Sequence, residues 1–555
     1  MKQERYINHK VVFKLFISMI AQERNLLRNI LGYALIAGFL SLVVPVAAQA
    51  VINHIAFVAQ LWPLLVLSSI VFFTLLFSGL THLLQMYFIE LMEQRLFVKT
   101  MLNFGITIPR ISQDIFYDKS SKVLVPKLLE VLFLQKSFRS LLLEGIAVLL
   151  QTFIGLVLLA FYHPVFLAFD LILILGIFLT LVVFFKKGIT SSIEESYAKY
   201  GVIEKFESIR RNDLVFRSEQ GRNWIFNKID TSVLEYLKKR KAHFRVILKQ
   251  TVLSVSIQVC MLSSLLGIGG WLVIKGHINI GQLVAAEIVV GLISVGLLKL
   301  GKHLESYYDL IASTQKLWEV VDLPEEKTGD EKLFLEKEVN IRIKDLCLKY
   351  SDGTVIFDQA SLNLNSGVIY AITGIEGSGK SSLADVLYGL QRPNAGILQI
   401  NNQDYRNLDL GTLRNNIVLL RSLDILPVSV KENLTINTNY TEKEIQEVLD
   451  VLDFSDEILS LENGIHTHLK AFGNPLTFSS AWKLIFARSL LMKPKVWIMD
   501  GVLDYVEEKI RKALLDEILK KDPHAIVIIL TRDVDVMAFA HQIYKVKDSK
   551  ILVGI

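Results

Sequence analysis

The residues best suited to chemistry lie in one loop of this 555-residue chain, Gly374–Ser381, which reads Gly-Ile-Glu-Gly-Ser-Gly-Lys-Ser. The loop matches the phosphate-binding pattern G-x-x-x-x-G-K-[ST] at every position. Residues 368–372 before it are apolar and strand-like, and residues 382–388 after it are typical of a helix. Glycines let backbone N–H groups converge on phosphate oxygens, and a helix N-terminus adds a favourable dipole. The pattern therefore predicts a nucleotide site.

Each side chain of the loop has an expected role at the phosphates. Lys380 is expected to reach the β- and γ-phosphates of ATP, and Ser381 is expected to ligate Mg²⁺. The residues predicted to bind nucleotide here are Gly374, Glu376, Gly377, Ser378, Gly379, Lys380, Ser381 and Ser382. The alternative is a glycine-rich turn that binds nothing, and the complete match between a strand and a helix argues against it.

The composition indicates a membrane protein. Hydrophobic residues make up 52% of the chain and charged residues only 21%, and the mean hydropathy is +0.42. A net charge of +5 gives no bulk signal for nucleic-acid binding. Cys260 and Cys347 are the only cysteines, so neither a disulfide framework nor a cysteine metal site is implied.

Three long apolar blocks predict six membrane spans. The first block, residues 29–89, contains no Lys, Arg, Asp or Glu and is divided by the polar pair Asn53-His54. Each half is long enough for a span of about 20 residues. The other two blocks are broken at Tyr162-His163-Pro164 and at Lys275-Gly276-His277. The predicted spans are 32–52, 62–88, 142–162, 164–186, 251–274 and 279–302.

Lysine and arginine orient these spans. The long connections after the second and fourth spans are rich in both, whereas Lys275 is the only Lys or Arg in the three short connections. The long connections are therefore expected in the cytoplasm, together with both termini. The first 28 residues are charged and lack the apolar core of a cleavable signal. We expect a multi-pass protein of a bacterial inner (plasma) membrane.

Four charged residues within the apolar blocks are nominal candidates for a cargo path, because intramembrane charge is costly. They are Glu144, Asp170, Glu287 and Lys299. Glu144 and Lys299 are expected near the cytoplasmic ends of their spans, where a charge needs no functional explanation. Asp170 and Glu287 are therefore the stronger candidates, with a structural role as the alternative.

The composition changes along the chain and predicts four parts. Residues 1–28 form a cytoplasmic N-terminal segment, 29–312 a transmembrane domain, 313–339 a charged linker and 340–555 a nucleotide-binding domain. In the last part, strand-like runs alternate with helical stretches, which favours a largely parallel sheet. The predicted fold class is an all-α six-helix transmembrane domain followed by an α/β P-loop nucleotide-binding domain.

Two further motifs accompany the phosphate loop. Leu348-Lys349-Tyr350 precedes the loop, and Ile498-Met499-Asp500 ends an apolar strand. Together with six spans and long cytoplasmic loops, they resemble a half-transporter of the ABC exporter family. Residues 40–53 resemble the opening span of type I secretion and peptide exporters. The resemblance implies that Tyr350 stacks on adenine and that Asp500 holds Mg²⁺ through water.

The chain departs from the family pattern where the family carries out hydrolysis. The glutamine that senses the γ-phosphate falls on Arg421, and the signature L-S-G-G-Q falls on Leu476–Ser480. Within this signature, Thr477 keeps a hydroxyl that could contact nucleotide. The carboxylate that polarises the attacking water falls on Gly501, and the switch histidine falls on Thr531. The resemblance therefore implies no intact catalytic residue.

These departures lead to a hypothesis about turnover. The groups that hold nucleotide are kept, and those that position water, sense the γ-phosphate or close a dimer are altered. A positioned general base contributes roughly 10²–10⁴-fold in rate, and glycine supplies none of it. The sequence predicts an ABC-type exporter subunit that binds ATP and Mg²⁺ but hydrolyses ATP slowly, if at all.

The resemblance also implies partners. A homodimer would have two defective sites, which favours pairing with a second half-transporter in the lipid bilayer, and type I secretion adds a periplasmic adaptor as a further candidate. Protein, peptide and lipid-like cargo all stay open. One alternative is a non-transporting membrane pseudo-ATPase that acts as a nucleotide-sensing scaffold or regulator. Another is an active homodimeric ATPase with an unorthodox catalytic base.

Overall fold

The computed structural model describes residues 12, 16–18, 20–57, 60–113, 124–335, 338–350, 352–436, 438–470 and 473–554. The chain divides into two compact units, with the main boundary between Pro324 and Glu325. The first unit is helical. The second contains two sheets with helices packed on them.

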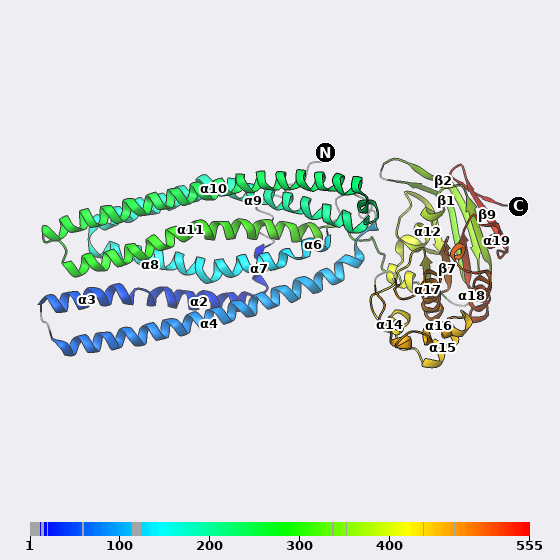
Figure 1. Ribbon diagram of the computed structural model, residues 1–555, viewed down its shortest axis with the longest axis horizontal. Helices are drawn as coiled ribbons and strands as arrows, with labels where there is room; N and C mark the ends of the chain where they lie inside the picture. Colours follow the sequence, from blue (N-terminus) through cyan, green and yellow to red (C-terminus); the bar gives the residue numbers. More distant parts are fainter. Residues whose placement is uncertain are drawn as a thin grey trace. The chain divides into compact units, whose positions relative to one another are not determined.

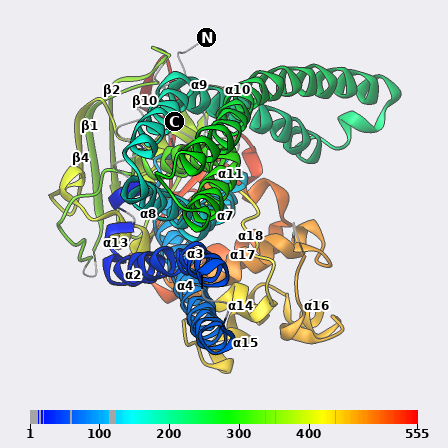
Figure 2. The same ribbon diagram turned by 90° about the vertical axis from the view of Figure 1, so that its left-hand side faces the viewer.

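The first unit is a bundle of long helices that run side by side (Figure 1). Six helical segments among its described residues are long and apolar enough to cross a membrane, so the predicted six-helix architecture is confirmed. Figure 2 looks along the bundle and shows α9 paired with α10, and α2 and α3 beside α4. The helices are α2 (Arg24–Leu40), α3 (Val43–Phe57), α4 (Leu61–Thr107), α6 (Leu124–Leu128), α7 (Glu130–Ser140), the π-helical turn η3 (Leu141–Gly145), α8 (Ile146–Tyr162), α9 (Pro164–Arg211), α10 (Glu219–Ile274) and α11 (Ile280–Val321).

The polar breaks at 162–164 and 275–277 are where helices end and begin, whereas Asn53-His54 lies within α3, which continues to Phe57. His163 is the N-cap of α9, and its Nδ1 accepts a hydrogen bond from the Val165 N–H at 3.2 Å. Pro164 follows at the first helical position, where a missing N–H costs nothing. Asn279 starts α11 with a capping box, which satisfies N–H groups that have no partner within the helix. Local chemistry thus sets these turns.

The outer faces of the bundle are apolar and its centre is tightly packed. Phe72, Phe73 and Phe161 are 62%, 66% and 82% exposed, an arrangement that suits lipid rather than water. At the centre, Val289 of α11 is buried, and a Cβ on Gly155 of α8 would lie only 3.1 Å from it. Small residues such as Gly155 let helix backbones approach closely in membranes.

The second unit contains one parallel and one antiparallel sheet. The larger sheet has six strands in the order β10-β9-β3-β8-β7-β6 and is parallel except for β10. Its strands are β3 (Ile369–Gly374), β6 (Ile417–Leu420), β7 (Val496–Asp500), β8 (Ile526–Leu530), β9 (Gln542–Lys547) and β10 (Lys550–Val553). The antiparallel sheet has the order β2-β1-β4-β5, with β1 (Asn340–Lys349), β2 (Val355–Asn365), β4 (Ala395–Ile400) and β5 (Gln403–Asp404). The predicted α/β domain with a largely parallel sheet is confirmed.

Both faces of the larger sheet are buried. Successive side chains of a strand point to opposite faces, so Val527 and Ile529 join one apolar core while Ile526 and Ile528 join the other. This burial on both faces explains why β7 and β8 are continuous apolar runs. The helices of this unit are α12 (Lys380–Tyr388), α13 (Leu410–Asn416), α14 (Val430–Thr435), α15 (Glu442–Val451), α16 (Ser455–Leu459), α17 (Phe478–Met492), α18 (Glu508–Lys521) and α19 (Val534–Met537).

The segment predicted as a linker, 313–339, is partly built into structure. Helix α11 continues through its beginning to Val321. Farther along, Glu331 exchanges backbone hydrogen bonds with Asn407 and Asp409. Glu326 accepts two hydrogen bonds from the Arg414 guanidinium at 2.7 and 2.8 Å. This two-point contact fixes the start of the second unit to α13.

We predict that Glu326→Ala destabilises the second unit, because it leaves a guanidinium that is only 23% exposed without its carboxylate. Loss of hydrogen bonds to a charged group of this kind costs about 1–3 kcal/mol. The apparent melting temperature of the detergent-solubilised chain should fall by roughly 3–10 °C, measured by scanning fluorimetry. The matched control is Glu447→Ala, whose 3.9 Å pair with Lys443 is exposed and worth little. Equal melting temperatures for the two variants would contradict a stabilising role of the contact between Glu326 and Arg414.

Candidate functional site

The candidate nucleotide site lies where four parallel strands end. Strands β3, β8, β7 and β6 are neighbours and run in the same direction, so their carboxyl ends meet at one edge of the sheet, where ligands bind in such folds. The predicted site residues follow these strands directly. They are the loop Gly374–Ser381 after β3, Thr531 after β8, Asp500 and Gly501 at the end of β7, and Arg421 after β6.

The phosphate loop has the backbone its glycines predict. Gly377 and Gly379 have φ values of +73° and +103°, in the region that favours glycine. A Cβ on Gly379 would also lie 2.6 Å from the Ile356 side chain. Lys380 starts α12 and donates to the carbonyl of Gly374 at 2.8 Å. The loop therefore presents the backbone and ammonium groups that suit a nucleotide's phosphates.

The Lys380 ammonium is partly buried and lies near side chains of both charges. Burial, and after it the nearby Arg532 guanidinium, lower the pKa of Lys380 from its ordinary value, against the opposing effect of Asp500 and Glu376. Arg532 itself forms a 3.5 Å ion pair with the exposed carboxylate of Glu376. Anionic phosphates would stabilise the charged form of the ammonium.

Tyr350, which the resemblance assigns to adenine stacking, lies beside the start of α12. Its hydroxyl is 2.7 Å from Ser382 Oγ, and the residue is 40% exposed. The ring therefore borders the phosphate loop and keeps an accessible surface on which a base could stack. Ser382 is buried and holds the tyrosine rather than facing solvent.

Arg421 and Asp500 emerge from the sheet side by side. Leu420 at the end of β6 pairs with Met499 of β7. Because paired strands stay in register, the next residues, Arg421 and Asp500, follow at the same level. Two residues that are far apart in the sequence are thus placed in contact by strand pairing.

The Arg421 guanidinium connects three elements of the site. Its Nε donates to Asp500 Oδ2 at 2.7 Å, its Nη1 donates to Asp385 Oδ1 at 2.7 Å, and its Nη2 donates to the Ser381 carbonyl at 2.9 Å. Burial disfavours the charge, but Asp385, and after it Asp500, outweigh this and raise the pKa of Arg421 above its ordinary value. Arg421 is therefore a permanent cation that joins β6, β7 and α12.

This arrangement does not fit the predicted magnesium site at Ser381 and Asp500. A nucleotide-bound Mg²⁺ takes one or two carboxylates together with phosphate oxygens. Here the Asp500 side chain is only 13% exposed and already bonds a cation at 2.7 Å. A second cation at the same carboxylate would be repelled by the guanidinium. The groups around Asp500 therefore form an ion pair and not a metal-binding site.

The two positions expected to act on water carry no suitable group. Gly501 has φ +69° and donates its N–H to the Leu530 carbonyl at 2.9 Å. Thr531 is 3% exposed, and its hydroxyl donates to Asp504 Oδ1 at 2.9 Å. Burial raises the pKa of Asp504, although the Thr531 hydrogen bond opposes this. Neither position offers the carboxylate or imidazole found in the family.

The altered signature begins helix α17. Thr477 is the N-cap, and its Oγ1 accepts from the Ser480 N–H at 3.1 Å. Ser480 in turn donates its hydroxyl to the Glu457 carboxylate. The Thr477 hydroxyl predicted to contact nucleotide therefore caps its own helix. Phe478, at the first helical position, is 55% exposed.

An aromatic cluster next to the signature was missed by sequence reasoning. Phe478 meets Tyr505 edge to face at 5.6 Å between ring centroids, and Trp482 stacks on Tyr505 at 6.4 Å. Tyr505 ends the short helix η8 (Leu503–Tyr505), which follows β7 and Gly501. Two aromatic residues four positions apart on one helix face, Phe478 and Trp482, were the available signal.

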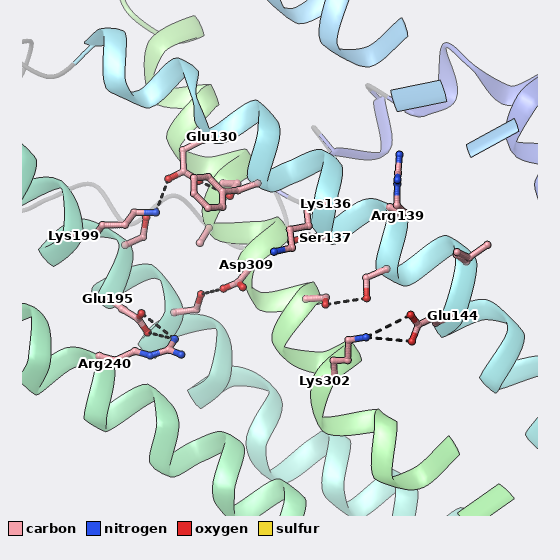
Figure 3. A pocket seen from close by; sticks show the side chains of 18 residues that line it. Glu130, Lys136, Ser137, Arg139, Glu144, Glu195, Lys199, Arg240, Lys302 and Asp309 are labelled. Atoms are coloured by element: carbon pink, nitrogen blue, oxygen red, sulfur yellow. Dashed lines mark hydrogen bonds and ion pairs between the residues drawn. The ribbon is translucent and has the colours of Figure 1, made fainter. Parts of the chain in front are cut away.

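A polar pocket of about 500 Å³ lies in the first unit, among α7, η3, α9, α10 and α11 (Figure 3). Ion pairs and serine hydroxyls line it, and the buried Oγ of Ser196 has no hydrogen-bond partner within the described residues. The ion pairs link different helices. They are Lys199 with Glu130 at 2.9 Å, Arg240 with Glu195 at 3.1 Å and Lys302 with Glu144 at 3.3 Å.

The four charges predicted within the apolar blocks have different surroundings. Glu144 lies in the pocket lining and also pairs with Lys299 at 4.0 Å, so the structure brings these two together. Asp170 is buried, and its Oδ1 has no partner among the residues that the structure describes. Glu287 is exposed on α11. Asp170 and Glu287 are not part of the pocket lining.

The comparisons with known proteins agree with this architecture. Residues 357–503 match the ABC transporter family. Over 545 residues, 97% of this chain and 75% of the relative, the chain is 21% identical to the lactococcin-A transport/processing ATP-binding protein LcnC of Lactococcus lactis subsp. lactis. The chain is a homologue of the ABC exporters. Its second unit is an ABC transporter domain.

One further relative and one solved structure also resemble this exporter homologue. It is 29% identical over 282 residues to the alpha-hemolysin translocation ATP-binding protein HlyB of Escherichia coli O157:H7, an alignment that spans 50% of this chain but only 40% of that relative. A solved bacterial Atm1-family ABC exporter with ATP bound superposes with a TM-score of 0.81, at 14% identity, over 95% of this chain and 94% of that one. The exporter fold thus extends over both units.

We predict that a carboxylate at position 501 does not by itself raise ATP turnover by this half-transporter. In Gly501→Glu the side chain has room, since no atom would lie within 4 Å of a Cβ added to this glycine. However, φ +69° costs a non-glycine residue about 1–2 kcal/mol, and Thr531 and Phe478 stay unchanged. ATP turnover by the purified variant should remain at the background of the parent chain in a phosphate-release assay. Turnover about tenfold above that background would contradict this prediction.

Proposed function

We propose that this half-transporter is the nucleotide-binding but hydrolysis-impaired subunit of an ABC-type exporter, paired with a second half-transporter. The observation that carries the proposal is the ion pair between Arg421 and Asp500 beside Gly501. It places a fixed cation and a glycine where the family has a γ-phosphate sensor and a carboxylate. The neighbouring phosphate loop keeps the geometry that suits nucleotide.

In this proposal, ATP is held by residues that survive from the family pattern. The glycine-rich loop and Lys380 bind the phosphates, and Tyr350 supports the base. The triphosphate of ATP is a polyanion that suits the N–H groups of the loop and the Lys380 ammonium. Its flat adenine ring suits stacking on Tyr350. Gly501 and Thr531 provide neither a carboxylate nor an imidazole to activate the attacking water. The roughly 10²–10⁴-fold rate contribution of a general base is therefore lost.

Pairing with a different half-transporter is supported by the signature segment. In ABC exporters this segment faces the nucleotide of the partner chain. Here its Thr477 hydroxyl caps α17, and Phe478 and Tyr505 expose large rings beside it. Two such chains would combine two altered signatures with two sites that lack a base. A second half-transporter with its own intact carboxylate would give the pair one site with a base, and this chain's altered signature would face the nucleotide there.

The proposed setting is a bacterial inner membrane with both termini in the cytoplasm, supported by the distribution of Lys and Arg between the long and short connections. A periplasmic adaptor belongs to the same proposal through the likeness to the hemolysin translocation protein. Among the cargo classes, the ion pairs and serines of the polar pocket favour peptide over lipid-like cargo, because such a lining interacts poorly with acyl chains.

We predict nucleotide binding without turnover by the purified chain in nanodiscs. A fluorescent ATP analogue should bind, and Lys380→Ala should weaken its binding by at least about tenfold, because a charge-assisted contact to phosphate is lost. Phosphate release should stay at background in both samples. The control is Lys443→Ala, an exposed lysine of α15, which should bind like the parent chain.

Two outcomes would contradict this part of the proposal. Absence of binding by the parent chain would remove the nucleotide role. Appreciable turnover that is lost in Lys380→Ala would remove the hydrolysis defect. If that turnover were also lost in Asp504→Asn, the carboxylate of Asp504, which accepts from Thr531, would be the unorthodox base of an active ATPase.

We further predict that affinity purification from the native membrane recovers a second ABC half-transporter with intact L-S-G-G-Q and Asp-Glu motifs. Phe478→Ser should reduce its recovery severalfold, because an exposed ring at the signature is lost. The matched control is Phe334→Ser, another exposed phenylalanine of the second unit. Recovery of this chain alone would contradict the pairing.

Vesicles that contain both half-transporters separate an exporter from a non-transporting scaffold. Only the exporter moves a cargo across the bilayer when ATP is supplied. Labelled peptides and a labelled phospholipid should therefore be offered side by side, and peptide movement is expected. Movement of neither cargo in vesicles with active ATP turnover would favour the scaffold or regulator.

A further inference from the structure

We infer that Arg421 takes the place of Mg²⁺ in this nucleotide site, so that the chain binds a nucleoside triphosphate as the metal-free anion. The inference rests on the proposed function, because it assumes that the phosphate loop holds nucleotide. It goes beyond that function by naming the form of the ligand and the residue that selects it.

The first support is the position of the guanidinium. Strand pairing fixes Arg421 beside Asp500, as the register of Leu420 with Met499 shows. The bond from Nη2 to the Ser381 carbonyl, 2.9 Å long, places the same group against the first turn of α12. Ser381 is the residue whose hydroxyl was expected to ligate the metal. The cationic group therefore contacts the Asp500 carboxylate and the backbone of Ser381, the two residues expected to hold the metal.

The second support is the occupation of the carboxylate. Asp500 accepts from Nε of Arg421 at 2.7 Å, and Asp385 accepts from Nη1 of the same side chain at 2.7 Å. A guanidinium presents its donors in a rigid planar fork that matches carboxylates. To free Asp500 for Mg²⁺, the fork would have to give up its bond to Asp500 while its bonds to Asp385 and to the Ser381 carbonyl hold the guanidinium in place. The ion would then still lie close to this positive charge.

The third support is the charge that remains for the ligand. Arg421 and Lys380 are both close to Asp500, and Arg532 adds a further positive charge near Lys380. These fixed cations can neutralise phosphate oxygens as a metal does, and they need no ligand exchange to do so. Glutamine at position 421, the family's residue, would carry no charge and would leave Asp500 open to a cation.

The experiment measures how the affinity for a fluorescent ATP analogue depends on Mg²⁺. The full chain in nanodiscs is titrated with the analogue in excess Mg²⁺ and again in excess EDTA. For the parent chain the two dissociation constants should agree within about threefold, since no metal contact is gained or lost. For Arg421→Gln, binding should be at least about tenfold tighter with Mg²⁺ than with EDTA.

Three further variants make the result specific. Arg406→Gln removes an exposed guanidinium with a two-point carboxylate contact in the same unit, and it should respond to Mg²⁺ like the parent chain. Arg421→Lys keeps a cation and should stay less dependent on Mg²⁺ than Arg421→Gln. In the double variant Arg421→Gln with Asp500→Asn, the gained dependence should disappear, because the freed carboxylate is removed.

The outcomes separate this inference from the function beneath it. If the parent chain binds the analogue and Mg²⁺ tightens its binding as much as that of Arg421→Gln, the inference is overturned while the nucleotide role stands. If the double variant keeps the gained dependence, Asp500 is not the ligand and the assignment is also overturned. If the parent chain binds nothing with or without Mg²⁺, the proposed function itself fails.

Discussion

The ion pair between Arg421 and Asp500 is the interaction on which the character of the nucleotide site depends. The pair joins the ends of two parallel strands, and Arg421 continues to Asp385 and to the backbone of α12. Both carboxylates are therefore paired with a cation of the protein itself before any ligand binds. In such a site, binding and catalysis are separable, because phosphates need only cations and N–H groups, whereas hydrolysis needs a base aimed at water.

The fold could largely be predicted from the sequence, because its signals are local. Apolar length identified the six spans, and the turns at His163 and Asn279 arise from capping groups next to them in the chain. The alternation of strands and helices identified the α/β unit. The extension of α11 to Val321 could not be predicted, since charged residues suit a helix that continues into water as well as they suit a linker.

The site was predictable in its members but not in its contacts. The position of Arg421 could be found by counting from neighbouring motifs. Its bond to Asp500 depends on which strands are neighbours and in what register, and a single sequence does not contain that information. The same holds for Tyr505, which meets Phe478 only because η8 (Leu503–Tyr505) lies beside the start of α17. Long-range packing decides such contacts.

The ion pairs around the polar pocket also bear on how the first unit moves. Each pair joins two helices: Glu130 and Lys199 join α7 to α9, and Glu195 and Arg240 join α9 to α10. Sliding of these helices past one another requires the pairs to separate and find new partners. Dissolved salt weakens such pairs where they reach solvent. Any change of shape that separates these pairs would therefore depend on the ionic strength of the solution around them.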